Sequence, residues 1–134
     1  MTSNFKKLEK DKILDLNSKG WSLKPSPNKY HCYDAYGKDP KGFTCWVEMK
    51  FRNDYYETKM IEKVKYDDLM KLTGKKFFYV KDKKGEYLFR LDKVKMPTYR
   101  IIDCPNTSMW DKTKRSKKVY LLKEIQASKI IRNK

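Results

Sequence analysis

Cysteine and histidine are scarce in this chain. The three cysteines, Cys32, Cys45 and Cys104, lie far apart and form no Cys-x-x-Cys pair. Their number and spacing argue against a disulfide framework and against a structural zinc site. The single histidine, His31, cannot build a histidine-based metal site by itself. We therefore expect buried free thiols at the three cysteines and assign no role to His31.

Long apolar segments are also missing. No run of residues approaches the roughly 18 apolar residues of a membrane span. No helical stretch combines a strong apolar face with a basic one, as a helix lying on an anionic membrane would. The N-terminus, Met-Thr-Ser-Asn-Phe-Lys-Lys, lacks the apolar core of a signal peptide. We therefore expect no membrane contact and an intracellular, cytoplasmic protein.

What the chain has in excess is positive charge. Its 134 residues include 33 Lys and Arg against 17 Asp and Glu, a net charge of +16. Such an excess attracts polyanions, and nucleic acid is the first candidate. The six Phe, ten Tyr and three Trp make the chain too aromatic for a disordered basic tail, and its length fits one folded domain, residues 1–134. Lysine outnumbers arginine 28 to 5, a bias that a lysine-rich source proteome would also produce.

Residue patterns predict an α+β fold in which a mixed β-sheet is flanked by helices. Apolar periodicity, with Gly20 and Gly74 as stop signals, predicts helices at residues 5–18 and 58–72, and the tail predicts a third at 124–132. We expect strands at 30–36, 44–51, 76–80, 87–94, 99–104 and 118–122. The proline-rich residues 21–28 predict an extended edge piece, and residues 37–42 predict a hairpin turn.

The strand at residues 45–51 carries two charges in an otherwise apolar run. Alternation along a strand places Glu48 and Lys50 on one face and the apolar Val47 and Met49 on the other. Burying two charges costs free energy unless they pair with each other or bind something. Any chemistry in this chain is therefore expected at Glu48 and Lys50.

Asp34 lies on the preceding strand of the predicted hairpin. With a turn centred near Asp39 and Pro40, its cross-strand neighbours fall between about Cys45 and Glu48. The carboxyls of Asp34 and Glu48 are therefore expected to converge. Two carboxylates this close repel each other unless one takes up a proton or a divalent cation lies between them. Oxygen ligands from acids, completed by water and a phosphate oxygen, suit Mg²⁺.

A third carboxylate is predicted to point toward the sheet from the first helix. At about 100° per residue, Glu9 falls between Phe5 and Ile13, inside the apolar stripe of that helix. The alternative is that Glu9 lies at the edge of the stripe and extends its carboxylate to water.

An acid followed two positions later by a lysine is a weak signal in so lysine-rich a chain. The same spacing recurs at residues 39–41, 57–59 and 82–84. Glu48 and Lys50 differ from these in their setting, an apolar strand that follows a turn and a strand carrying an Asp. We expect the other three to lie in polar loops or at termini.

An acid on the first helix, an Asp near the second strand and Glu-x-Lys on the third resemble the PD-(D/E)xK nuclease superfamily. The matching residues are Glu9, Asp34, Glu48 and Lys50, and the resemblance covers residues 5–80. Within the superfamily the chain is most similar to small Holliday-junction resolvases and phage-type endonucleases. It departs from the pattern at the residue before Asp34, which is Tyr where the family often has Pro.

The resemblance implies a restriction-endonuclease-like α/β/α core and Mg²⁺-dependent hydrolysis of DNA, with Mn²⁺ as a substitute. Asp34 and Glu48 would be metal ligands, Glu9 an accessory ligand, and Lys50 would orient the attacking water. Lys65 stands where related nucleases often place a polar site residue, although a lysine at the edge of a helix explains it too. The resemblance also implies a homodimer, by analogy with resolvases that cut two strands symmetrically.

Basic residues beyond the matched set are expected to hold phosphates. These residues are Arg52, Lys65, Lys112, Lys114, Arg115, Lys117 and Lys118. Trp110 and Tyr99 could stack on an unpaired base, or could equally belong to the core.

Three readings therefore stay open. The first is a DNA endonuclease. The second is a non-catalytic module that binds DNA or RNA with a nuclease-like fold. The third is a structural or interaction protein whose charge reflects its source proteome.

Overall fold

The computed structural model describes residues 2–27, 32–105 and 114–133. Its helices are α1 (Thr2–Ser18), α2 (Lys63–Met70) and the 3-10 helix η1 (Glu124–Gln126). Its strands are β1 (Ser22–Pro25), β2 (Ala35–Lys38), β3 (Thr44–Phe51), β4 (Thr58–Glu62), β5 (Lys75–Asp82), β6 (Gly85–Arg90), β7 (Arg100–Pro105), β8 (Lys114–Lys123) and β9 (Lys129–Arg132).

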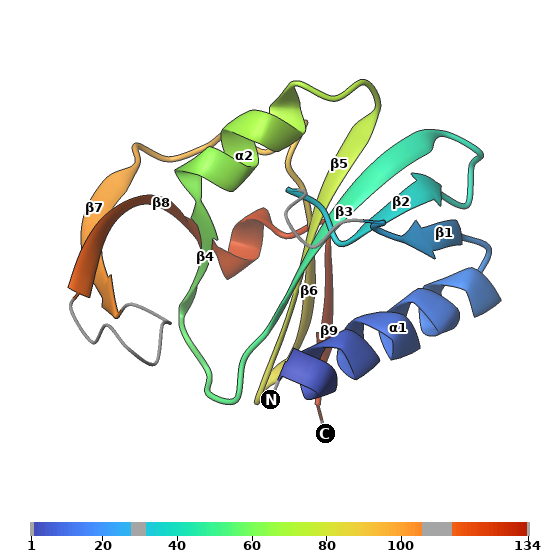
Figure 1. The fold of residues 1–134 in the computed structure, drawn as a ribbon, viewed down its shortest axis with the longest axis horizontal. Helices are drawn as coiled ribbons and strands as arrows, with labels where there is room; N and C mark the ends of the chain where they lie inside the picture. The colour runs from blue at the N-terminus through green and yellow to red at the C-terminus, as the bar shows by residue number, and fades with distance from the viewer. Residues whose placement is uncertain (1, 28–31, 106–113, 134) are drawn as a thin grey trace.

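The strands form two sheets. The main sheet has the order β1-β2-β3-β5-β6-β9, and a smaller sheet has the order β4-β8-β7. Strands β3 and β5 run parallel while the other neighbours of the main sheet run antiparallel, so the predicted mixed sheet is confirmed. Helix α1 lies on one side of the main sheet, and α2 lies with the smaller sheet on the other (Figure 1).

Each face of the main sheet has its own apolar core. Under α1, Ile13 and Leu16 pack with Val47 and Met49 of β3. The opposite face is filled by buried side chains from both sheets and α2, among them Ile61, Leu69, Phe78, Phe89 and Leu122. Strand β3 therefore lies between two cores, and a charged residue at its centre is buried whichever face it points to.

The predicted helix at residues 58–72 is wrong over its first five residues. Thr58–Glu62 form β4, which pairs antiparallel with β8, and only Lys63–Met70 are helical. Along β4 the buried residues alternate, with Lys59 and Ile61 inside. The pairing residues of β8 lie more than 50 positions later, from Val119 to Lys123, so local periodicity does not reveal them.

The predicted C-terminal helix at residues 124–132 is also wrong. After the single turn of η1, β9 pairs with β6 at the edge of the main sheet. Ile130 and Ile131 are β-branched and favour a strand. The backbone N–H of Ser128 donates to the carbonyl of Leu88 over 2.8 Å and starts this pairing. Pairing with a distant strand again decides the local structure.

The hairpin before β3 begins later than predicted. The strand expected at residues 30–36 is β2 at Ala35–Lys38, so Gly37 belongs to a strand and not to the turn expected at 37–42. Residues 28–31 lie outside the described part. Gly37 has φ +151°, and a Cβ there would lie 1.9 Å from the Ser22 carbonyl oxygen. Glycine is therefore needed for β1 to approach β2.

Smaller corrections concern strand ends and cysteines. Strand β6 ends at Arg90 and not at residue 94, while β1 occupies the sheet edge that the proline-rich segment predicts. Cys45 is buried as expected, but Cys32 is only half-buried. His31 and the Cys104 side chain lie outside the described part. Within residues 2–27, 32–105 and 114–133, no helix is long and apolar enough to cross a membrane.

Candidate functional site

Strand β3 directs Glu48 toward the face of the main sheet that α2 covers. Val47 and Met49 pack in the core under α1, while Trp46 packs against the core of the opposite face, so the predicted alternation is confirmed. Glu48 is 3% exposed. Burial is the largest cause of the raised pKa of Glu48, which lies well above the ordinary value for glutamate.

Asp34 is fixed beside Glu48 by the backbone of β3. Its N–H donates to the carbonyl of Val47 over 2.8 Å, and its Oδ2 accepts the N–H of Met49 over 2.7 Å. The Asp34 side chain therefore lies next to Glu48, the residue between Val47 and Met49. A hydrogen bond between the carboxyls of Asp34 and Glu48, and then the charge of Asp34, raise the pKa of Glu48 further. The structure thus brings together the two carboxyls that the hairpin predicts to converge.

Glu9 of α1 belongs to the same electrostatic cluster. Burial and then the charge of Asp34 raise its pKa from 4.5 to about 7, against the opposing charges of Lys6 and Lys65. Glu9 is partly buried. The carboxyl therefore lies within electrostatic reach of Asp34. The predicted apolar stripe of this helix is buried at Ile13 and Leu16. At its other two positions, Phe5 and Leu8 are 49% and 38% exposed.

Lys65 of α2 makes the ion pair that compensates Glu48. Its Nζ lies 2.8 Å from Glu48 Oε2. Burial lowers the pKa of Lys65, but the nearby carboxylates outweigh it and the pKa lies above the ordinary value for lysine. These carboxylates are Glu48, Asp34 and Glu62. The structure places Lys65 on the central carboxylate of the candidate site, and its contact with phosphate stays a prediction.

The donor set of this cluster suits Mg²⁺. Asp34 and Glu48 offer carboxylate oxygens at one place, with Glu9 nearby, and oxygens are the ligands that Mg²⁺ prefers. A divalent cation between two carboxylates relieves the repulsion that otherwise raises a pKa. Among the described residues no three His, Cys, Asp or Glu side chains form a complete metal cluster. Water or phosphate oxygens would have to complete the coordination.

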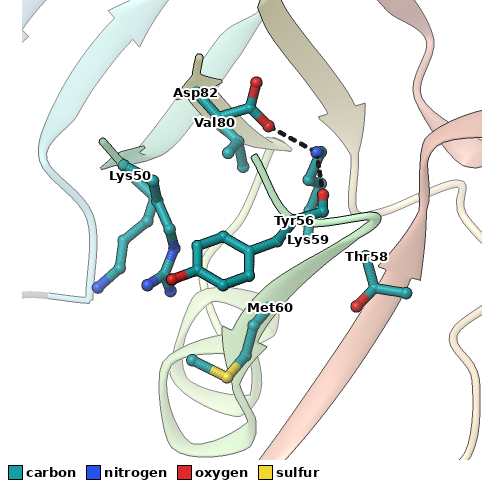
Figure 2. Close-up of a pocket in the computed structure, with 8 residues that line it drawn as sticks. Lys50, Tyr56, Thr58, Lys59, Met60, Val80 and Asp82 are labelled. Atoms are coloured by element: carbon teal, nitrogen blue, oxygen red, sulfur yellow. Dashed lines mark hydrogen bonds and ion pairs between the residues drawn. The ribbon is translucent and has the colours of Figure 1, made fainter. Parts of the chain in front are cut away.

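Lys50 borders the cluster on the side of the β3–β4 connection. It lines a narrow pocket with Arg52, Tyr56 and Lys59, and in Figure 2 its side chain extends away from the Lys59–Asp82 pair. Burial, then the charges of Lys65 and Arg52, lower the pKa of Lys50. The Arg52 guanidinium lies 5.6 Å from the centre of the Tyr56 ring. Lys50 is therefore a half-buried cation next to the carboxylates.

Sequence reasoning missed Glu62, which lies at the start of α2. Its carboxylate accepts a hydrogen bond from Lys117 of β8 over 2.9 Å, and its pKa is lowered by Lys117, Lys65 and Lys50 against the effect of burial. The helix predicted at residues 58–72 hid this position, because it placed Glu62 mid-helix. Glu62, the last residue of β4, therefore interacts both with Lys117 of the smaller sheet and with the site lysines Lys50 and Lys65.

The other predicted phosphate contacts are only partly visible. Lys118 is exposed, and its Nζ lies 5.4 Å from the centre of the Tyr99 ring, which Lys63 also approaches. Lys114 and Arg115 belong to β8, but their side chains lie outside the described part, as do Trp110 and Lys112 altogether.

The other acid-x-Lys matches lie in a turn or at strand ends, as expected. Asp39 and Asp82 are nevertheless buried, at 6% and 5% exposure. Asp39 forms an ion pair with Lys75 over 2.6 Å. Its carboxylate also accepts hydrogen bonds from backbone N–H groups of its own turn. Asp82 pairs with Lys59 over 2.7 Å. Both acids stabilise turns next to a strand.

Replacing Glu9 by Gln is expected to stabilise the protein at pH 8 and to change little at pH 4. The pKa of Glu9 is higher in the folded state, about 7 against 4.5, so the free energy of unfolding falls as the pH rises through this window. Partial exposure screens the effect, and we expect a gain of about 1 kcal/mol. Urea unfolding at both pH values measures it. Glu57→Gln, at an exposed glutamate, is the control, and an equal gain at both pH values would contradict the assignment.

The comparisons with known proteins bear on the fold. No family model matches the chain, and no curated protein matches its sequence. Among solved structures, the chain is similar to Hjc, a Holliday junction resolvase from the archaeal hyperthermophile Archaeoglobus fulgidus, with a TM-score of 0.56. The two are 12% identical, and the match covers 87% of this chain and 88% of that one. The predicted α+β, restriction-endonuclease-like fold is therefore confirmed.

Proposed function

We propose that this chain is a Mg²⁺-dependent endonuclease that hydrolyses phosphodiester bonds of DNA, with Mn²⁺ as a substitute and branched DNA as the substrate class. The observation that carries the proposal is the buried Glu48, placed against Asp34 in a strand that also carries Lys50. A sheet protein has no structural need for two adjoining carboxyls in this position, because their burial and repulsion cost free energy. The resolvase-like fold supports the same conclusion.

Each residue of the cluster has a defined part in this reaction. Asp34 and Glu48 would hold the ion, with Glu9 as an accessory ligand. Mg²⁺ bound there supplies a Lewis acid that lowers the pKa of water and offsets the charge of the phosphate. Lys50 donates hydrogen bonds that orient the attacking water and stabilise the charge developing on the phosphate oxygens.

The positive surface supplies the affinity for DNA. The net charge of +16 and the exposed Lys118 favour a sequence-independent, salt-sensitive interaction with phosphates. Lys117 contributes less, because Glu62 already holds its ammonium. A homodimer would present two such sites to the two strands of a junction.

A cleavage assay tests the proposal directly. The full chain is incubated with labelled four-way junction, duplex, single-stranded DNA and RNA, in Mg²⁺, in Mn²⁺ and in EDTA. We expect metal-dependent cleavage that is fastest on the junction. Cleavage of no substrate in either metal would overturn the proposal, and equal cleavage of duplex and junction would overturn the assignment of branched DNA.

Replacing Lys50 by Met is expected to lower the cleavage rate about 100-fold, because a donor to the developing charge is lost. Metal affinity and DNA affinity should persist, since neither rests on Lys50 alone. Single-turnover cleavage and fluorescence anisotropy measure the two quantities. Lys41→Met is the matched control, because Lys41 also follows an acid by two residues but is exposed on a turn. Unchanged cleavage by Lys50→Met would remove Lys50 from the mechanism.

A second candidate is a nucleic-acid-binding module without catalysis, for DNA or RNA. The Lys65–Glu48 ion pair favours it, because the pair compensates the buried Glu48 without a metal ion. Salt-dependent binding of junctions by both the unmodified chain and Glu48→Gln, with cleavage by neither, would establish this second function.

A further inference from the structure

The ion pair between Lys65 and Glu48 joins a fixed anion to a movable cation. The Glu48 side chain is 4% exposed and belongs to a central strand, while the Lys65 side chain is 41% exposed on a short helix. A buried strand residue has almost no alternative position, whereas a surface lysine has many rotamers at little cost. Only the lysine can leave this contact without disturbing the core.

Lys65 also has a second anion within electrostatic reach. Glu62, at the start of the same helix, interacts favourably with it, and Glu62 is about one-third exposed. Glu62 is the N-cap residue of α2, three positions before Lys65. A displaced Lys65 ammonium therefore keeps a carboxylate within electrostatic reach, one that it would share with Lys117.

We propose that Lys65 is an internal cation that occupies Glu48 until a divalent cation takes its place, so that metal binding at this site is an exchange with the lysine. The inference rests on the proposed function, because it concerns the same carboxylates. Glu48 Oε2 is already at hydrogen-bond distance from Nζ. A divalent cation at the same carboxylate repels the Lys65 ammonium, and the repulsion energy is twice that of a monovalent cation at the same distance.

The exchange has two consequences for the site. Without metal, Lys65 makes the ion pair that compensates the buried Glu48 beside Asp34. With metal, the contact that the lysine gives up must be subtracted from the binding free energy, so the site fills only at a higher concentration of divalent ion. Removing the lysine charge therefore tightens metal binding.

Isothermal titration of the full chain with Mn²⁺ tests the exchange, without DNA and at about 0.15 M salt, where charges beyond roughly 8 Å are screened. We expect Lys65→Gln and Lys65→Met to bind Mn²⁺ about tenfold more tightly, the equivalent of one charge-assisted hydrogen bond. Lys65→Arg keeps the ion pair and should bind no more tightly than the unmodified chain. Lys63→Gln removes a charge from the same helix turn, at a lysine paired with Asp67, and should change the affinity less than twofold.

The outcomes separate this inference from the proposed function. Equal Mn²⁺ affinity in the unmodified chain, Lys65→Gln and Lys65→Met would overturn the exchange and leave a metal-dependent nuclease intact. Tightening by Lys63→Gln as large as by Lys65→Gln would also overturn it, because the effect would then be one of general charge. Absence of Mn²⁺ binding in every variant, together with absence of DNA cleavage by the unmodified chain, would overturn the proposed function itself.

Discussion

Glu48→Gln is expected to lose DNA cleavage by about 10³-fold or more while it stays folded and binds DNA. The amide keeps the shape of the side chain but cannot supply the negative charge that holds a divalent ion. Single-turnover cleavage of a four-way junction in Mg²⁺ measures the loss, and anisotropy on the same junction measures binding. The large effect follows from the central position of Glu48, which contacts Lys65 and adjoins Asp34.

The same substitution should raise stability at neutral pH. The pKa of Glu48 is raised in the folded state, so charging it opposes folding, and a neutral amide removes that cost and can donate to Asp34. We expect a gain of about 1 kcal/mol at pH 8 in spite of the lost ion pair with Lys65. An inactive variant that is also more stable would show that the carboxylate is retained for function.

The matched control is Glu57→Gln, at an exposed glutamate that directly precedes β4. It changes the same residue type at the same spacing from a lysine, and we expect unchanged cleavage. Full activity of Glu48→Gln would contradict the assignment of Glu48, and loss of activity in Glu57→Gln would show that the assay reports on folding.

The core of the candidate site was predictable because its determinants are local. Glu48 and Lys50 share one face of a strand whose alternation is legible in the sequence, and a short turn fixes the position of Asp34 relative to Glu48. The roles of these residues and of Glu9 remain predictions. The pairing of Lys65 with Glu48 was not predictable, because it depends on how α2 lies over the sheet.

Errors in the fold occur where pairing between distant strands outweighs local preference. Residues 58–62 and 129–132 become strands because β8 and β6 present unpaired backbone groups to them. The smaller sheet was therefore not foreseen, and neither was the position of Glu62 at the start of a helix. Lys59 is the clearest case. The predicted helix would expose this lysine, whereas in β4 its side chain is buried, with 2% of the residue exposed.

Asp82→Ala is expected to destabilise the protein more than any other substitution considered for this chain. The side chains of Lys59 and Asp82 are each 1% exposed, and Lys59 Nζ lies 2.7 Å from Asp82 Oδ2 (Figure 2). Removing one partner of a buried pair costs about 3–5 kcal/mol. Without Asp82, the carboxylate left to the Lys59 ammonium among the described residues is the more distant one of Glu124, at 3.3 Å. Asp82 also accepts the backbone N–H groups of Lys84 and Gly85, so the turn between β5 and β6 loses its acceptor as well.

Thermal and urea unfolding measure this cost, and a fall in melting temperature of about 10 °C or more is expected. Asp68→Ala is the control, because Asp68 pairs with Lys71 over 3.4 Å on the surface and exposed pairs contribute little.

Lys59→Met should cost less than Asp82→Ala. The methionine keeps an apolar side chain of similar length beside Tyr87, and Asp82 keeps its two backbone donors. Equal melting temperatures for Asp82→Ala and Asp68→Ala would show that the pair is hydrated in solution. A larger loss for Lys59→Met than for Asp82→Ala would show that the packing of the stem matters more than the charge.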